Sequence, residues 1–223
     1  MKRSEINKII KDAKAFFDEM KFRLPPIAFW SPEQIKAGGP AIQEILDCGI
    51  GWDLTDFGLG EYHKTGLLLF TVRNGDAGDP ANPKTYAEKA MVVEEGQVTP
   101  WHFHTSKIED IIVRAGGDLV LHLSDTDANG ALIDAPVTVA TDGVTHTVEH
   151  RGAVTLTPGE SITLPQGLAH QFYGRKGSAT VLVGEVSSVN DDQTDNTFIE
   201  PVGRFPDIEE DEEPLHLLCN EYP

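Results

Sequence analysis

The feature that most constrains this chain is a pair of histidines, His102 and His104, inside the glycine-bracketed stretch Gly96–Gly116. Side chains two positions apart on a β-strand point to the same face of a sheet. The two imidazoles therefore project side by side if this stretch is a strand. Glu109 lies at the start of a second strand predicted over Ile108–Val113, where it can fold back toward the histidines. Two imidazoles and a carboxylate form a metal-ligand set that lacks one or more partners.

A second stretch, Gly159–Gly174, supplies the missing partner. It reads as a strand over Ser161–Leu164, a turn at Pro165–Gly167 and a further strand that His170 opens. Three imidazoles and one carboxylate suit manganese, iron, cobalt, nickel or zinc. An octahedral ion held by four protein ligands keeps two positions open for the oxygens of a substrate.

Together the two stretches resemble the paired motifs of the cupin superfamily, G-x5-H-x-H-x4-E-x6-G and G-x5-P-x-G-x2-H-x3-N. The chain matches every position of the first motif and departs from the second only at its end, where Gly174 replaces an asparagine that is structural in the family. The resemblance implies an all-β fold, the cupin double-stranded β-helix (jelly-roll barrel). It also implies that one metal ion is bound by His102, His104, Glu109 and His170.

The rest of the pattern predicts helices before the barrel and short strands within it. Apolar residues at helical spacing predict an amphipathic helix over Ser4–Met20, and a capping box at Ser31 starts a short helix that precedes another over Pro40–Cys48. Short strands at regular spacing favour a sandwich or barrel over βαβ units. They are predicted over Leu67–Arg73, Lys89–Val93, Leu119–Leu123, Val137–Ala140, Thr145–Val148, Ala153–Leu156 and Ala179–Glu185. We therefore expect a helical extension over residues 1–60, the barrel over 61–206 and a tail over 207–223.

The formal net charge of −18 argues against nucleic acids, phosphate-rich partners and anionic membranes. No stretch approaches the ~18 apolar residues of a membrane span, and no signal peptide is evident. Cys48 and Cys219 are far apart and are expected to be reduced thiols, which favours a cytoplasmic location. The acidic run Glu209–Glu213 is predicted to be a solvated surface.

Two other polar segments invite a functional interpretation. Asp125–Gly130 begins like a calcium-binding EF-hand loop, but Pro136 stands where the bidentate glutamate belongs, so an ordinary turn is favoured. Among the remaining histidines, His63 lies in a polar, aromatic loop that is able to reach a pocket mouth.

The tail narrows the functional prediction. Gly184–Pro206, with the acidic DIEEDEEP run after it and the HFHTSKIED segment of the first motif, resembles the bacterial D-lyxose ketol-isomerases along essentially the whole chain. The resemblance implies interconversion of D-lyxose with D-xylulose, and of D-mannose with D-fructose, on free monosaccharides. It further implies manganese as the metal, a cis-enediol whose two oxygens the metal holds, and a homodimer.

Aldose–ketose isomerisation needs a base near C1 and C2 and a donor for the oxygens. Glu200 is the candidate base, because it lies in the apolar, proline-flanked run FIEPVG where burial would strengthen it. Lys107, in the turn between the ligand strands, is the candidate donor, although a solvent-exposed lysine is the alternative. Arg204 and Asp207 are the candidate substrate-binding residues, and an ordinary surface salt bridge is the alternative for Arg204. If Glu200 is not the base, Asp207 or Glu185 is next.

Two alternatives stay open at this point. A cupin phosphosugar isomerase would use the same metal chemistry, but it needs a cationic cradle, and the chain has 18 Lys and Arg against 36 Asp and Glu. A dioxygenase or a non-enzymatic sugar-binding cupin could use the same ligand set.

Overall fold

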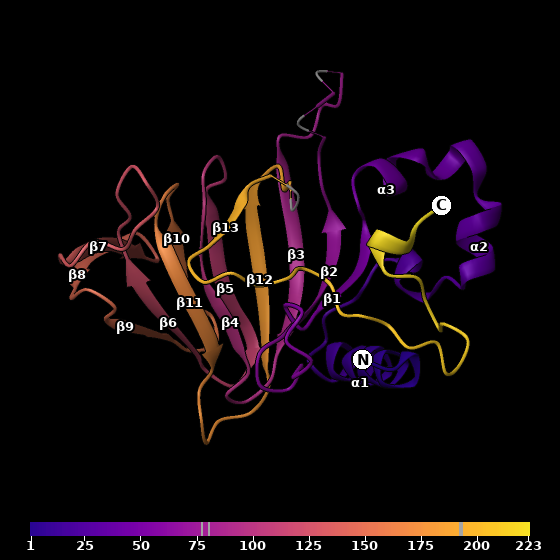
Figure 1. Cartoon of the computed structure of the whole chain (residues 1–223), viewed down its shortest axis with the longest axis horizontal. Coiled ribbons are helices and arrows are strands. Elements are labelled where there is room, and N and C mark those ends of the chain that lie inside the picture. The colour runs from indigo at the N-terminus through magenta and orange to yellow at the C-terminus, as the bar shows by residue number, and fades with distance from the viewer. Residues whose placement is uncertain (77, 80, 192–193) are drawn as a thin grey trace.

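Two antiparallel β-sheets lie face to face in the computed structural model, which describes residues 1–76, 78–79, 81–191 and 194–223 (Figure 1). The larger sheet has the order β1 (Gly51–Thr55), β2 (Leu67–Arg73), β3 (Tyr86–Val93), β12 (Val181–Ser188), β5 (Glu109–Gly116), β10 (Ser161–Leu164), β7 (Val137–Thr141) and β8 (Val144–Val148). The smaller has the order β13 (Asn196–Phe198), β4 (Val98–His104), β11 (Ala169–Gly174), β6 (Leu119–Ser124) and β9 (Ala153–Leu156). This arrangement confirms the all-β, cupin-type prediction.

The main hydrophobic core fills the space between the two sheets. Side chains from inward-facing positions of both sheets meet there, because alternate residues of a strand point to opposite faces. Representative members, each at most 3% exposed, are Met91, Ile111, Leu121, Ile162 and Phe172. The site described below lies in this same interior.

A second core covers the outer face of β1, β2 and β3, against which α1 (Arg3–Glu19) packs (Figure 1). Ile6, Ile10 and Phe17 of this helix belong to the same buried cluster as Trp52 and Phe70. The β1 and β2 strands are thus covered on both faces, which explains why their burial is continuous instead of alternating. The predicted N-terminal amphipathic helix is confirmed.

The other helical segments are short. They are η1 (Pro26–Phe29), α2 (Pro32–Ala37), η2 (Gly39–Ile42), α3 (Gln43–Asp47) and η3 (Cys219–Glu221). The capping box that starts α2 is present, with Ser31 Oγ accepting from Gln34 N and Gln34 Oε1 accepting from Ser31 N. The single helix expected over Pro40–Cys48 is instead a 3₁₀ turn followed by α3. Among the described residues, no helix is both long and apolar enough to span a bilayer.

Two strands, β1 and β13, differ from the sequence prediction. The first strand, Gly51–Thr55, lies inside the segment assigned to the helical extension and pairs with β2 along its whole length. The β13 strand was not predicted, and it pairs with the end of β4 that carries His102 and His104. Residues 77, 80, 192 and 193 of the predicted barrel segment lie outside the described part of the chain.

Residues Glu209–Glu213 are all exposed, which agrees with the predicted solvated acidic surface, but three of these carboxylates also contact α1. Arg3, which is 1% exposed, donates from Nε and Nη2 to Glu210 at 2.9 and 2.6 Å. Asp211 accepts from Ser4 N at 2.9 Å, and Glu212 accepts from Asn7 Nδ2 at 2.6 Å. These carboxylates face the N-terminal turns of α1, where negative charge is favourable. The tail therefore fastens the helix to the molecule.

The turn prediction for Asp125–Gly130 agrees with the structure. Asp127 Oδ1 accepts from Asn129 N at 2.8 Å and from Ala131 N at 2.9 Å, so this carboxylate closes the turn. His63 does not line the interior cavity, and its Nδ1 lies 2.7 Å from Glu94 Oε2 at the surface. Cys48 and Cys219 are not joined by a disulfide.

Candidate active site

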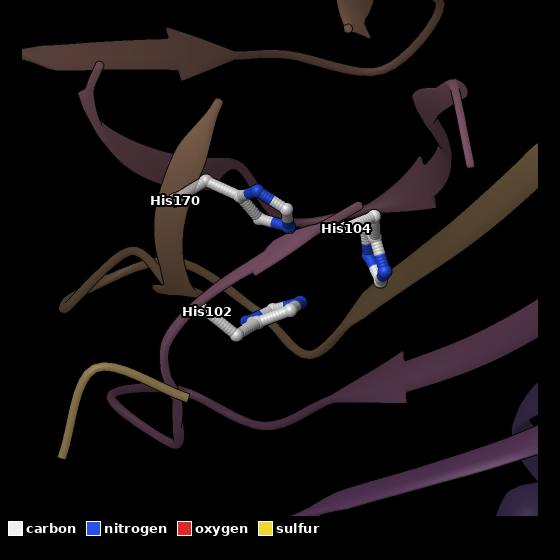
Figure 2. Close-up of side chains that lie close together, drawn as sticks. All are labelled: His102, His104 and His170. Atoms are coloured by element: carbon white, nitrogen blue, oxygen red, sulfur yellow. The ribbon is translucent and has the colours of Figure 1, made fainter. Parts of the chain in front are cut away.

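Three histidines converge inside the barrel because β4 and β11 lie next to each other. His102 pairs directly with His170 across the two strands, and His104 follows two positions along β4. Figure 2 shows the three rings turned toward one another, and one ligand atom of each lies within 4.8 Å of the others. The alternation expected from the HxH spacing is therefore confirmed.

Backbone carbonyls orient two of these rings. His102 Nδ1 lies 2.8 Å from the Pro100 carbonyl oxygen and His170 Nδ1 lies 3.1 Å from that of Leu168. Since a carbonyl oxygen only accepts, each Nδ1 carries the proton and each Nε2 keeps a free lone pair. That is the tautomer a metal ligand needs.

Glu109 brings a carboxylate to the same point from the other sheet. Its Oε1 atom lies 3.2 Å from His170 Nε2 and 3.5 Å from His104 Nε2, and the residue is 3% exposed. No well-directed hydrogen bond from the described residues reaches the buried Nε2 of His170. An inward-facing nitrogen without a partner, beside a carboxylate oxygen, fits a site for a cation.

The local electrostatics favour the metal-binding protonation states. Burial, reinforced by the neighbouring His170 and His104, holds the pKa of His102 well below its usual range. Burial alone would raise the pKa of Glu109, but the Lys107 ammonium and His104 outweigh it and hold that pKa well below the usual range. A neutral imidazole and an ionised carboxylate are the forms that bind divalent ions. The donor set thus fits the metal ion that the sequence predicts.

Lys107 is buried next to this cluster. It is 2% exposed, and its Nζ lies 2.7 Å from Glu109 Oε2 and 2.9 Å from Glu185 Oε1. Burial lowers its pKa, but attraction to the two carboxylates is stronger, and the net effect raises it. The alternative of a solvent-exposed turn lysine is therefore wrong, and the site holds a fixed positive charge.

Glu185 and Lys89 face each other beside Lys107. They are paired residues on β12 and β3, respectively 5% and 4% exposed, with Lys89 Nζ 3.7 Å from Glu185 Oε1. Sequence analysis named Glu185 only as a reserve and overlooked Lys89. The available signal was a charged residue within an otherwise apolar strand, AEKAMVV for Lys89 and VLVGEVSS for Glu185.

A cavity joins these groups. Part of its lining is apolar and part carries polar and charged groups, which is typical of a site for a small polar molecule. The apolar wall comprises Phe57, Leu67, Leu69, Met91, Ile111, Phe172 and Phe198. The polar side comprises Thr55, Thr99, Asn196 and Arg204 together with Lys89, His102, His104, Lys107, Glu109 and Glu185.

Arg204 lines the cavity and is paired with a buried carboxylate. Its Nη2 donates to the buried carboxylate of Asp53, and its guanidinium stands 4.7 Å from the centre of the Phe205 ring. Its carbonyl oxygen accepts from Thr55 Oγ1. The alternative of an ordinary surface salt bridge does not hold, because Asp53 is 2% exposed.

The other two candidates from the tail lie away from the cavity. Glu200 is exposed and does not line it, so the burial expected for this residue is wrong. The run FIEPVG is apolar in sequence, but its glutamate turns outward where the chain leaves β13. Asp207 is also exposed, and its carbonyl oxygen accepts from the N-terminal ammonium at 2.7 Å.

Comparison with known proteins gives a consistent result. The family model described as D-lyxose isomerase matches residues 1–222. A D-lyxose/D-mannose isomerase of Escherichia coli O157:H7 is 47% identical over 223 residues, covering 100% of this chain and 98% of that protein. One of Serratia proteamaculans is 45% identical over 225 residues, with the same coverage. Among solved structures, the Cellulomonas parahominis L-ribose isomerase with L-ribose superposes with a TM-score of 0.63 at 17% identity, covering 94% of this chain and 98% of that one.

Proposed function

The chain belongs to the D-lyxose isomerase family and is an aldose–ketose isomerase, and we propose that it interconverts D-lyxose with D-xylulose and D-mannose with D-fructose. Two relatives at 45% and 47% identity carry the name D-lyxose/D-mannose isomerase, which supports this choice of sugars. The observation that carries the proposal is that three converging histidines and Glu109 lie next to a buried lysine–glutamate pair. His102, His104 and Glu109 line the same cavity as Lys107 and Glu185.

His102, His104, Glu109 and His170 would hold one divalent ion, with Mn²⁺ as our first choice and Co²⁺, Fe²⁺, Ni²⁺ or Zn²⁺ as alternatives. When bound, such an ion acts as a Lewis acid that polarises the sugar carbonyl. The chain's own task is to orient the sugar, exclude water and move one proton between C1 and C2.

We assign the proton transfer to Glu185 in place of Glu200. Among the described residues, Glu185 is the cavity-lining carboxylate outside the metal cluster. Its hydrogen bond from Lys107 holds one carboxylate oxygen in place, which leaves the other to take the proton. The proton then returns to the neighbouring carbon of the cis-enediol.

Lys107 would stabilise the negative charge that develops on the sugar oxygens. Its ammonium lies next to both Glu109 and Glu185, so it stands between the metal cluster and the proposed base. A buried donor of this kind acts most strongly as charge develops, because no water screens it.

The far end of the sugar would meet Arg204 and the apolar wall. Arg204 can donate to hydroxyl groups, while Phe57 and Phe198, whose ring centroids are 5.6 Å apart, pack against C–H groups. Lys107 and Arg204 already have buried carboxylate partners, which argues against a phosphate subsite. The cavity therefore suits a free sugar better than a phosphorylated one.

Parallel assays on one preparation test this proposal. Metal-loaded protein should isomerise D-lyxose and D-mannose, take up no oxygen, and give a lower kcat/KM with the 6-phosphate of mannose than with mannose. A preference for the phosphorylated sugar would favour a phosphosugar isomerase, and oxygen uptake would favour a dioxygenase.

A further inference from the structure

Asp195, which sequence analysis did not single out, lies behind the metal cluster just before β13. It is 4% exposed, and its Oδ1 atom accepts three hydrogen bonds from the turn that joins β4 to β5. The donors are Thr105 Oγ1 at 3.0 Å, Ser106 N at 2.7 Å and Ser106 Oγ at 2.6 Å. Since this turn leads directly into Lys107, one carboxylate oxygen of Asp195 fixes the segment that carries the buried lysine.

The second oxygen faces the remaining histidine of the cluster. Asp195 Oδ2 lies 3.4 Å from His104 Nδ1. Both atoms are buried, and neither makes a well-directed hydrogen bond within the described part of the chain, so this 3.4 Å approach is a charge–dipole contact and not a formed hydrogen bond. His102 and His170 direct Nδ1 to backbone carbonyls, so His104 differs in facing a carboxylate.

We propose that Asp195 is a positioning residue that keeps the proton on His104 Nδ1 and so presents Nε2 of that ring to the metal ion. A carboxylate accepts only, so it selects this tautomer and raises the basicity of the opposite nitrogen. The β13–β4 pairing, with Asn196 opposite His104, holds Asp195 at this place. The inference rests on the proposed function in one respect, namely that the cluster binds a divalent ion.

The competing role for Asp195 is purely mechanical, a clamp on the turn. Asp195→Asn separates the two. Its amide oxygen can keep the bonds to Thr105 and Ser106, but its NH₂ group would then face His104 Nδ1. A donor there favours the other tautomer, whose Nε2 carries the proton and cannot bind metal.

The experiment measures Zn²⁺ affinity by competition with a chromophoric chelator, together with the thermal midpoint of each protein. We expect Asp195→Asn to weaken Zn²⁺ binding by about 10–100-fold with little change in the midpoint of the metal-free protein. The matched control is Thr105→Val/Ser106→Ala, which removes two bonds to Oδ1 and leaves Oδ2 in place. The control should lower the midpoint and leave Zn²⁺ affinity within about 3-fold.

A measurement on the unaltered sequence covers the case in which Asp195→Asn does not fold. In the Zn²⁺-loaded protein, ¹H–¹⁵N spectra should show a protonated Nδ1 for His104, assigned by its loss in His104→Ala. A protonated Nε2, or Zn²⁺ affinity of Asp195→Asn within 3-fold of wild type, would overturn the role of Asp195. Failure of the wild type to bind any divalent ion would instead overturn the proposed metal site itself.

Discussion

The candidate active site contains a buried lysine, Lys107, between two buried carboxylates. Breaking a buried ion pair leaves an unpaired charge that costs several kcal/mol. We propose that this buried charge acts on the substrate oxygens.

The first prediction compares two glutamates with the same substitution. Glu185→Gln should lower kcat for D-lyxose by about 10²–10⁴-fold, because it removes the proposed base and keeps a hydrogen-bond acceptor for Lys107. Glu200→Gln, at an exposed position outside the cavity, is the matched control and should stay within a few-fold of wild type. The reverse order of effects in steady-state kinetics would return the role to Glu200.

At this scale the sequence predicts the convergence of the histidines better than it predicts the burial of Glu200. His102 and His104 follow from strand alternation, a local rule that needs no knowledge of the fold. The exposure of Glu200 depends on where the tail crosses the barrel mouth, which no local pattern encodes. The same holds for Asp195, which meets His104 only because β13 pairs with β4.

Among the elements, α1 and the C-terminal tail stabilise each other. Arg3 joins them, with Glu210 half exposed on one side and Glu221 largely covered on the other. The hydrogen bonds from Arg3 to Glu210 raise the pKa of Arg3, and those to Glu221 raise it further. Burial lowers this pKa but is outweighed, so Arg3 stays charged.

The second prediction follows from this contact. Arg3→Met should lower the free energy of unfolding by about 2 kcal/mol, between the values typical of exposed and buried pairs. Lys8→Met is the control, because the Lys8 and Asp12 side chains are 76% and 65% exposed and their loss should leave stability almost unchanged. Urea unfolding measures both, and equal losses would show that the tail does not fasten α1.

The third prediction concerns pH and another contact of the tail. His216 directs Nδ1 to the Trp30 carbonyl at 2.6 Å and Nε2 to Lys14 Nζ at 2.9 Å. Burial lowers the pKa of His216; the Trp30 carbonyl opposes this, and Lys14 adds to it. In the unfolded chain the pKa of His216 is near its ordinary value of about 6.5. Below that pH the unfolded chain binds a proton that the folded chain binds less readily. Stability should therefore fall as pH drops through about 6.5, by at most about 1.4 kcal/mol per pH unit from this group.

The variant His216→Gln isolates that effect, since glutamine can donate to Trp30 and accept from Lys14 without titrating. Urea unfolding at pH 7.5 and 5.5, with a chelator present so that metal release plays no part, should show a smaller pH-dependent loss in the variant. An equal loss in both proteins would contradict the assignment to His216.

Element prediction from sequence succeeded where hydrophobic patterning is strong. The β2, β9 and β10 strands have the predicted bounds, and the other predicted strands are correct to within a few residues. The β1 strand was missed because its sequence, GWDLT, contains Asp53, whose burial is stabilised by Arg204 from the distant tail. Three-residue β13 carries too little pattern to be recognised.

At the scale of the whole molecule, we propose that the enzyme is a homodimer. Tyr86, Ile108 and Val186 are 45%, 46% and 39% exposed, and strand register places them on the outer face of the large sheet. These apolar side chains lie among Glu88, Asp110 and Ser188, and we propose that this part of the outer face contacts the second copy.

Sedimentation velocity supplies the fourth prediction. The wild type should sediment as a dimer, and Val186→Asp should shift it toward monomer because the substitution buries an unpaired charge in the interface. A monomeric wild type would contradict the dimer, while a dimeric Val186→Asp variant would show that another face is used.

The central claim is that the cluster of three histidines and Glu109 makes isomerisation of a free aldose depend on a bound divalent ion. The most direct measurement is the rate of D-xylulose formation from D-lyxose by metal-stripped protein before and after Mn²⁺ is added, with His170→Ala alongside. We predict no turnover by stripped protein, full recovery with Mn²⁺ in the wild type, and neither metal uptake nor recovery in His170→Ala. Turnover by the stripped wild type at the rate of the loaded enzyme, with metal content confirmed as absent, would contradict the claim.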